Sequence, residues 1–306
     1  MTIDGEPDGF PDVGRPQAVR TIQACADLGI NLVDSAEIYG DGEGERRVGE
    51  AIRGRRDRWI VSTKFGMRRG PDGRRVRDLR PEAIAGSLEG SLRRLGTDYL
   101  DLYLYHHPPG PADLDATTEV LSRLRREGKI RHFGISTADP LLVGSLARRG
   151  LDVVMFPYSL RRSSSALRRA IRRGTLGGIV RGVFEGGLLT GRYDRGATPF
   201  PADDIRSRRG PVDGSEIAAL RELLPPGMSM ATLALRYVLD SETTHCAVIG
   251  ATSPDRYREA MESFRAAPLD AVTTRALRRL GRRLEGNTFL GRLRRAGLSR
   301  LRGLLR

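Results

Sequence analysis

The sequence predicts an α/β protein whose parallel strands close into a (β/α)8 TIM barrel, with the first strand missing or substituted. Short β-branched and apolar runs alternate with segments of helical period along the 306 residues. This alternation is typical of βα units in a parallel sheet. Seven such runs are found, and no GxGxxG motif follows the first of them. A closed barrel therefore fits better than an open doubly wound sheet.

The expected strands and helices follow one another in regular alternation. The strand-like runs cover residues 30–35, 59–64, 100–106, 130–136, 153–159, 178–184 and 247–250. The amphipathic segments between them include residues 16–28, 81–95, 115–127 and 140–149. No convincing strand precedes residue 16, where Asp, Gly and Pro dominate. We therefore expect either a short substitute near residues 10–13 or a gap in the barrel.

No stretch with the composition of a linker divides the chain, so residues 1–306 are expected to form a single barrel domain. Residues 193–214 form the longest irregular stretch and carry many charged, Gly and Pro residues. We expect this stretch to be a mobile cover over one end of the barrel. Residues 269–306 are expected to be a basic helical extension packed on or beside the barrel.

Several classes of protein are disfavoured by composition. No apolar stretch approaches the 18 residues expected of a membrane span. The first residues are acidic and rich in Pro and Gly, unlike a secretory signal. Cys25 and Cys246 lie far apart without metal-ligand spacing, which indicates buried thiols in a reducing compartment and no metal site. We therefore expect a cytoplasmic location.

The net charge of +14 is concentrated at the C-terminal end of the chain. Residues 275–306 contain 11 arginines and one acid, Glu285, and leucines recur there at near-helical spacing. This amphipathic segment could meet an acidic partner, a phosphorylated substrate or an anionic membrane. A terminal helix docked on the barrel with solvated arginines is the simpler interpretation. Nucleic acid is disfavoured, because no recognised binding module or aromatic interleaving accompanies the charge.

Lysine is rare in this chain: only Lys64 and Lys129 stand among 52 Lys and Arg residues. The skew is typical of a coding bias towards arginine. An ammonium is a compact charge whose pKa can shift, whereas a guanidinium is planar and stays protonated. Each surviving lysine therefore raises the question of whether an ammonium is required. We attribute Lys129 to chance.

Ionisable side chains come at the ends of three consecutive expected strands. The first run delivers Asp34, and Tyr39 follows in the loop AEIYG. The next run ends on Lys64, and the one after ends on His106. Active sites of β/α barrels lie at the carboxyl ends of the strands, where neighbouring parallel strands are about 4.8 Å apart. A carboxylate, a phenol, an ammonium and an imidazole are therefore expected to converge.

These four groups form a coherent acid–base set. A phenol is a weak acid at neutral pH, and a neighbouring ammonium stabilises its phenolate and lowers its pKa. Asp34 would hold Lys64 in place, while His106 would bind a substrate oxygen or relay a proton. Taken singly, each residue could be a solvated loop charge or a packing residue. Their joint occurrence favours catalysis, with protonation of a carbonyl oxygen by Tyr39.

The motifs around these residues resemble those of the aldo-keto reductase superfamily. The matching segments are GINLVDSAEIYG, VSTKFG, DYLDLYLYHHP, GKIRHFGIST, GGLLTGRY and IGATSPDRYREA, which together span roughly residues 16–264. The position of the proline selects His106 rather than His107 as the family's histidine. The resemblance implies a TIM barrel that reduces an aldehyde or ketone of a small molecule with NADPH, or less readily with NADH.

The resemblance also assigns a cofactor site. Ser136 and Thr137 match the residues at the nicotinamide amide, and Arg181 matches the residue that stacks on the ring. The remaining matches lie at the pyrophosphate, the ribose and the adenine; they are Gly182, Phe184, Gly187, Arg192, Gly250, Thr252, Ser253, Arg256 and Glu259. A helix N-terminus after Ser253 suits a phosphate group.

Two positions depart from the family pattern. Met155 stands where a glutamine amide is usual, and Ala260 stands where an asparagine is usual. A thioether cannot replace a bidentate amide. Three functions therefore remain open: a nicotinamide-dependent reductase, a non-redox enzyme that uses the same four residues for elimination, isomerisation or addition, and a catalytically inactive binding module.

Overall fold

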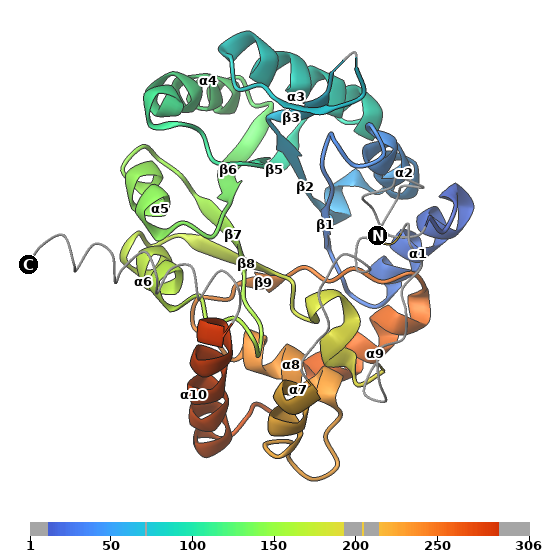
Figure 1. Cartoon of the computed structure of the whole chain (residues 1–306). Coiled ribbons are helices and arrows are strands. Elements are labelled where there is room, and N and C mark those ends of the chain that lie inside the picture. Colours follow the sequence, from blue (N-terminus) through green and yellow to red (C-terminus); the bar gives the residue numbers. More distant parts are fainter. Residues whose placement is uncertain (1–11, 71, 193–203, 205–213, 288–306) are drawn as a thin grey trace, which may run out of the picture.

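The computed structural model describes residues 12–70, 72–192, 204 and 214–287. Its main sheet has seven parallel strands in the order β1-β2-β5-β6-β7-β8-β9, and the sheet curls into a barrel ringed by helices (Figure 1). The predicted barrel is confirmed. The strands are β1 (Leu32–Asp34), β2 (Ile60–Phe65), β5 (Leu100–Tyr105), β6 (Ile130–Ser136), β7 (Val153–Pro157), β8 (Gly177–Arg181) and β9 (Cys246–Ala247).

The helices lie on the outside of the sheet, as the βα alternation predicts. The α-helices are α1 (Arg15–Asp27), α2 (Glu43–Ile52), α3 (Pro81–Leu95), α4 (Leu114–Arg126), α5 (Pro140–Ala147), α6 (Ser165–Arg173), α7 (Gly214–Arg221), α8 (Met230–Leu239), α9 (Pro254–Arg265) and α10 (Ala271–Asn287). Three 3-10 turns accompany them: η1 (Arg56–Arg58), η2 (Pro111–Asp113) and η3 (Glu185–Thr190). Helix α3 shows why the boundaries were predictable. It starts on Pro81, whose fixed φ suits a first turn, and stops at Gly96, which has a φ of 64°.

The seam between β9 and β1 lies where the first strand of an eight-stranded barrel was expected. Within the described residues, no strand precedes α1 and no backbone pairing joins β9 to β1. Helix α1 lies between α2 and α9 on the outside of this seam (Figure 1). The Gln17 side-chain amide donates to the carbonyl of Thr252 at 2.7 Å and so ties α1 to the segment after β9. Residues 10 and 11, part of the possible substitute, lie outside the described residues.

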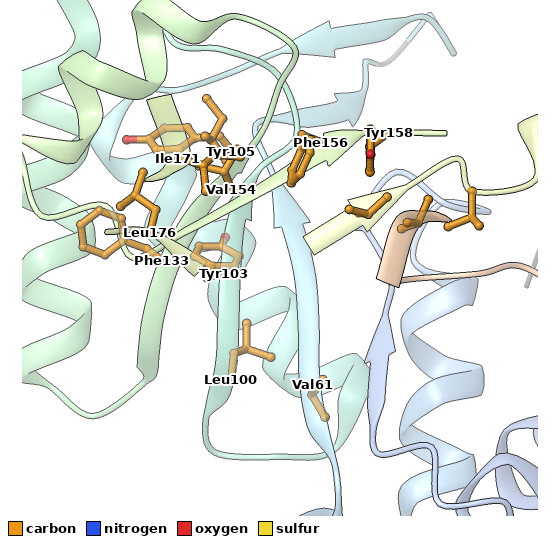
Figure 2. Packing of buried hydrophobic residues seen from close by; sticks show 14 of the residues in the cluster. Val61, Leu100, Tyr103, Tyr105, Phe133, Val154, Phe156, Tyr158, Ile171 and Leu176 are labelled. Atoms are coloured by element: carbon orange, nitrogen blue, oxygen red, sulfur yellow. The ribbon is translucent and has the colours of Figure 1, made fainter. Parts of the chain in front are cut away.

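Strand alternation separates the barrel interior from the layer between sheet and helices. On β5, Leu102 and Leu104 belong to a small interior cluster with Met155 and Ile179. Tyr103 and Tyr105 belong to the larger outer core. Figure 2 shows several aromatic and aliphatic side chains of this outer core against the strands. The two-residue period of a strand thus places one set of residues inside the barrel and the other under the helices.

At the end of the barrel where the strands begin, a buried carboxylate joins three strands. Asp101 is 6% exposed, and its carboxylate accepts from Arg56 at 2.7 Å and from Arg131 at 2.8 Å. It also accepts from the backbone amide of Val61 at 2.9 Å. Both guanidinium groups lie over the ring of Tyr99, at 4.0 and 4.3 Å from its centroid. This cluster holds β2, β5 and β6 together away from the site.

One pair of strands was not predicted from the sequence. A two-stranded antiparallel hairpin of β3 (Met67–Arg69) and β4 (Arg75–Arg77) follows β2 directly. Its strands are three residues long and contain mostly arginine, so they lack the apolar alternation that indicates a strand. The amide of Asp78 donates to the carbonyl of Gly66 at 3.2 Å and closes the base of the hairpin on the end of β2.

The structure bears on only part of the remaining expectations. Helix α10 forms the start of the basic extension, whereas residues 288–306 lie outside the described residues. The proposed cover, residues 193–214, lies almost wholly outside them as well. Cys25 is buried, Cys246 is half-buried, and both are free thiols. In the part of the chain that is described, no helix is long and apolar enough to cross a membrane, and no metal-binding cluster is present.

Candidate active site

Asp34 and Lys64 form an ion pair inside the mouth of the barrel. Strands β1 and β2 are hydrogen-bonded neighbours with Asp34 opposite Ser62, so alternation places Lys64 on the same inner face. The ammonium of Lys64 lies 2.5 Å from Asp34 Oδ2 and 2.8 Å from the carbonyl oxygen of Ser35. The other carboxylate oxygen, Oδ1, accepts from the Ser62 hydroxyl at 2.8 Å. Each group therefore has a fixed position.

The loop after β1 brings Tyr39 over this pair. Its amide donates to the carbonyl of Ala36 at 3.0 Å, while the amide of Glu37 donates to the carbonyl of Lys64 at 3.2 Å. The Lys64 ammonium lies 5.0 Å from the centroid of the Tyr39 ring. Burial disfavours the charge on Lys64, but the negative charge of Asp34 and of an ionised Tyr39 outweighs this effect and raises the pKa of Lys64. The ammonium thus stays charged although Lys64 is only 3% exposed.

His106 completes the group from the end of β5. Its backbone amide donates to the carbonyl of Phe65 at 3.0 Å, and its ring meets the ring of Tyr39 edge-on at 5.6 Å between centroids. Burial, then repulsion from Lys64 and from His107, lowers the pKa of His106 to about 3. The imidazole is therefore neutral at physiological pH. Its Nδ1 atom is buried and has no hydrogen-bond partner among the described residues.

Arg181 faces the same mouth from the far side of the barrel, at the end of β8. Burial lowers the pKa of Arg181, and attraction to Tyr39 partly offsets that effect. Solvent nevertheless reaches the side chain. Both observations fit a group on the wall of an open concave mouth, where many protein atoms surround a side chain without covering it. The expected convergence of Asp34, Tyr39, Lys64 and His106 is present, and Arg181 lies close enough to interact with them electrostatically.

The predicted cofactor residues follow the ends of β6, β8 and β9, on the other half of the same rim. Ser136 ends β6 opposite Met155, and its neighbour Thr137 donates its amide to the carbonyl of Met155 at 3.0 Å. Ser136 is 8% exposed and Thr137 is 4% exposed. The Thr137 hydroxyl accepts from the amide of Asp139 at 3.1 Å, which orients it towards the start of α5.

The segment after β8 is a tight turn that depends on glycine. Gly182 has a φ of 76° and Gly187 a φ of 101°, conformations that other residues rarely adopt. Phe184 packs against the outer core between them. Gly187 lies within the turn η3, and Arg192 beyond that turn reaches Glu259 on α9 at 3.1 Å. At these two glycines no side chain covers the backbone, as a close approach to a phosphate chain requires.

The segment between β9 and α9 carries Gly250, Thr252 and Ser253, and Ser253 is the N-cap residue of the helix. Arg256 and Glu259, one turn apart on α9, form an ion pair with N–O distances of 2.9 and 3.0 Å. Glu259 therefore accepts from both Arg256 and Arg192. The two guanidinium groups meet at one carboxylate beside the helix N-terminus, a position that suits an anion.

Sequence reasoning missed two residues of this site, Ser62 and His107, and it missed the burial of Glu37 in the loop beside the site. Ser62 could have been found, because it precedes Lys64 by two residues on a strand and must share its face. His107 was set aside in favour of His106, yet its ring stacks on that of His106 at 5.3 Å between centroids. Glu37 is half-buried in the loop before Tyr39, and burial raises the pKa of its carboxyl. A charged residue type gives no sequence signal for such burial.

The fold and the site together describe a β/α-barrel protein in which Asp34, Tyr39, Lys64 and His106 lie together at the carboxyl ends of the strands. The chain matches the model of the aldo/keto reductase family over residues 5–281 and belongs to that family. The family comprises oxidoreductases. Membership of it is evidence for carbonyl reduction with a nicotinamide nucleotide, without specifying the substrate.

Relatives and solved structures agree with this assignment. The NADH-specific methylglyoxal reductase of Escherichia coli is 31% identical over 299 residues, which are 89% of this chain and 90% of that protein. The holo form of an aldo-keto reductase from Bacillus halodurans has a TM-score of 0.76 at 32% identity and covers 88% of both chains. A glycerol dehydrogenase from Gluconobacter oxydans has a TM-score of 0.78 at 29% identity, with 89% of this chain and 86% of that one covered.

Proposed function

We propose that this chain reduces the aldehyde or ketone group of a small molecule to an alcohol, with NADPH preferred to NADH. The observation that carries the proposal is the buried ammonium of Lys64, which lies 2.5 Å from Asp34 and 5.0 Å from the Tyr39 ring. A bound nicotinamide supplies the hydride. The protein must then supply the proton and stabilise the charge that develops on the carbonyl oxygen.

Each of the four side chains has a defined part in that proton transfer. Tyr39 donates its hydroxyl proton to the carbonyl oxygen, and Lys64 stabilises the phenolate that remains. Asp34 and the carbonyl of Ser35 hold the ammonium at 2.5 and 2.8 Å, so that it cannot turn away. Neutral His106, at the edge of the Tyr39 ring, donates a hydrogen bond to the same substrate oxygen and places it beside the phenol.

The rim opposite the acid–base group fits a nicotinamide nucleotide in most of its parts. Ser136 and Thr137 would hold the nicotinamide amide, and Arg181 would lie on the ring. The glycine turn and Arg192 would meet the pyrophosphate, while Thr252, Ser253 and Arg256 would receive a ribose phosphate; Gly182, Phe184, Gly187, Gly250 and Glu259 would complete the site. The cationic Arg256 beside the helix N-terminus supports the preference for NADPH.

Met155 reduces the expected affinity. Its side chain is 1% exposed and packs with Leu102, Leu104 and Ile179 inside the barrel, so it offers no hydrogen bond to the nicotinamide. With Ala260, two polar contacts of the family pattern are absent. At about 1 kcal/mol each, their loss together weakens nucleotide binding by roughly thirtyfold. Met155→Gln should tighten nucleotide binding, although its amide must enter an apolar cluster and should lower the stability of the nucleotide-free protein.

The decisive test is a titration of the purified protein with NADPH and with NADH, followed by nucleotide fluorescence. NADPH should bind more tightly, and addition of a small aldehyde should oxidise the bound nucleotide. Equal or tighter binding of NADH would remove the preference. Failure of both nucleotides to bind would remove the reductase assignment and favour a non-redox acid–base enzyme or a binding module. Binding without oxidation of nucleotide by any carbonyl would favour a binding module.

A further inference from the structure

The β3–β4 hairpin is rich in arginine and directly follows the carboxyl end of β2, on the rim where the site lies. The hairpin starts three residues after Lys64, and its base closes on Gly66 through the amide of Asp78. The register opposes Met67 to Arg77 and Arg69 to Arg75, so alternation gives these four residues one face of the hairpin. Arg68 and Val76 have the other face, and together with Arg77 they help to line a crevice of about 650 Å³ next to the start of α4.

Arg75 differs from its neighbours in having no ion-pair partner among the described residues. Arg77 is partly neutralised by Asp113, at 3.6 Å. Arg74, in contrast, is 87% exposed and lies 3.7 Å from Asp72 in the hairpin loop. Arginine is abundant everywhere in this chain, so its presence on the hairpin alone indicates nothing. What distinguishes Arg75 is that its guanidinium is not paired with a carboxylate and lies on the hairpin beside the site.

The mouth between the hairpin and β8 has an excess of positive charge. Burial lowers the pKa of His107, and repulsion by Arg77, Arg181 and Arg75 lowers it further. Arg75 and Arg181 act in the same direction on His106. The backbone geometry agrees with these effects: the amide of His106 donates to the carbonyl of Phe65 at 3.0 Å, and Phe65 lies two residues before the hairpin. Among the described residues, the carboxylate of Asp34 pairs with Lys64, and that of Glu185 lies 3.8 Å from Arg162.

We propose that the carbonyl substrate carries an anionic group at the end remote from the reacting carbon, and that Arg75, with His107 beside it, receives this group. The anion is a carboxylate or a phosphate. His107 is exposed, and its stacking on His106 sets it at the entrance rather than at the reacting atoms. A neutral imidazole there offers a hydrogen bond, while Arg75 offers the charge. This inference rests on the proposed carbonyl reduction.

The test compares matched neutral and anionic aldehydes. Butanal and succinic semialdehyde form the carboxylate pair, and glyceraldehyde and its 3-phosphate form the phosphate pair. For at least one pair, kcat/KM should be higher for the anionic member. In Arg75→Gln, the ratio of anionic to neutral kcat/KM should fall by about tenfold or more, because one charge-assisted hydrogen bond is lost. Arg75→Lys should restore part of the ratio that Arg75→Gln loses. The substrate pair whose ratio falls in Arg75→Gln shows whether the anion is a carboxylate or a phosphate.

Arg74→Gln is the control, since it removes an equal charge from the same hairpin and should retain the wild-type ratio. Three results overturn the proposal: neutral members favoured in both pairs, an unchanged ratio in Arg75→Gln, or an equal fall in Arg74→Gln. If no carbonyl is reduced, the proposed function fails separately. Calorimetric titration with succinate and with glycerol 3-phosphate then tests whether the protein has an anion site at Arg75. Binding that Arg75→Gln weakens at least tenfold supports the site, and absence of such binding overturns it.

Discussion

The ammonium of Lys64 lies 2.5 Å from Asp34 Oδ2, and the same ammonium lies 5.0 Å from the ring of Tyr39. Lys64 is 3% exposed, whereas Lys129 lies on the surface beside Glu89. The two lysines of this arginine-rich chain therefore occupy opposite environments. Only at Lys64 is the space so confined that a compact ammonium and a larger planar guanidinium would behave differently.

Lys64→Arg should impair carbonyl reduction although it conserves the charge. A guanidinium is larger and planar, so it cannot take the position between Asp34 and the carbonyl of Ser35 without displacing Tyr39. We expect a fall in kcat of about a hundredfold or more, within the range for loss of acid–base assistance. Lys129→Arg is the matched control and should leave kcat unchanged. Equal activity of the two variants would show that the reaction does not require a lysine at position 64.

Tyr39→Phe should remove the proton donor while conserving the packing. The substitution deletes one hydroxyl in a solvent-accessible mouth, so the melting temperature should change little. Activity should fall by about 10²–10⁴-fold. Nucleotide binding, measured by fluorescence, should persist, which separates loss of chemistry from loss of the cofactor. Wild-type turnover in this variant would end the assignment of Tyr39.

The low pKa of His106 should make stability depend on pH. The folded protein holds this pKa at about 3, against 6.5 in an unfolded chain, so the unfolded state binds a proton first as the pH falls. The stability that His106 contributes through this shift is fully present above pH 6.5, and it is lost progressively as the pH falls to about 3. Between pH 7 and pH 5 the free energy of unfolding should decrease by about 2 kcal/mol through this group.

Urea denaturation of the wild type and of His106→Gln at both pH values measures that contribution. The glutamine variant should show a smaller decrease than the wild type, because its amide does not titrate. Identical decreases in the two proteins would mean that His106 is protonated as readily in the folded as in the unfolded state.

Asp101→Asn should destabilise the barrel at the end away from the site. The carboxylate accepts from Arg56, Arg131 and the amide of Val61 while it is 6% exposed. Loss of its charge leaves two guanidinium groups poorly paired, and we expect a cost of about 3 kcal/mol in the free energy of unfolding. Asp115→Asn breaks an exposed pair with Arg149 and should have little effect. Equal melting temperatures for the two variants would contradict the structural role of Asp101.

Arg256→Gln should discriminate between the two nucleotides. The side chain lies on the first turns of α9 and would meet the ribose phosphate that distinguishes NADPH from NADH. Affinity for NADPH should fall by about tenfold or more, while affinity for NADH should change by less than about threefold. Arg258→Gln, which breaks a pair with Asp255 on the same helix, is the control. Parallel losses for both nucleotides would remove Arg256 from the phosphate site.

Local pattern predicted most of the regular structure. The seven expected strands all exist, and β6 has the predicted bounds. The run of residues 178–184 is shorter as a strand, because the chain leaves the sheet after Arg181 at Gly182, with a φ of 76°. The hairpin β3–β4 was missed because its strands are charged and short. Its pairing is fixed by the turn and by the closure on Gly66, which leave no periodic signal.

The sequence by itself determined which side chains share the barrel mouth. Strand alternation and the common direction of parallel strands place Asp34, Lys64 and His106 on one rim, whatever surrounds them. Only the tertiary structure decided their environment: the burial of Lys64, the neutral state of His106, the engagement of Glu259 by two arginines, and the position of Arg75. Those properties depend on distances between segments remote in sequence. Electrostatic energy depends on separation and burial in space, which residue order does not specify.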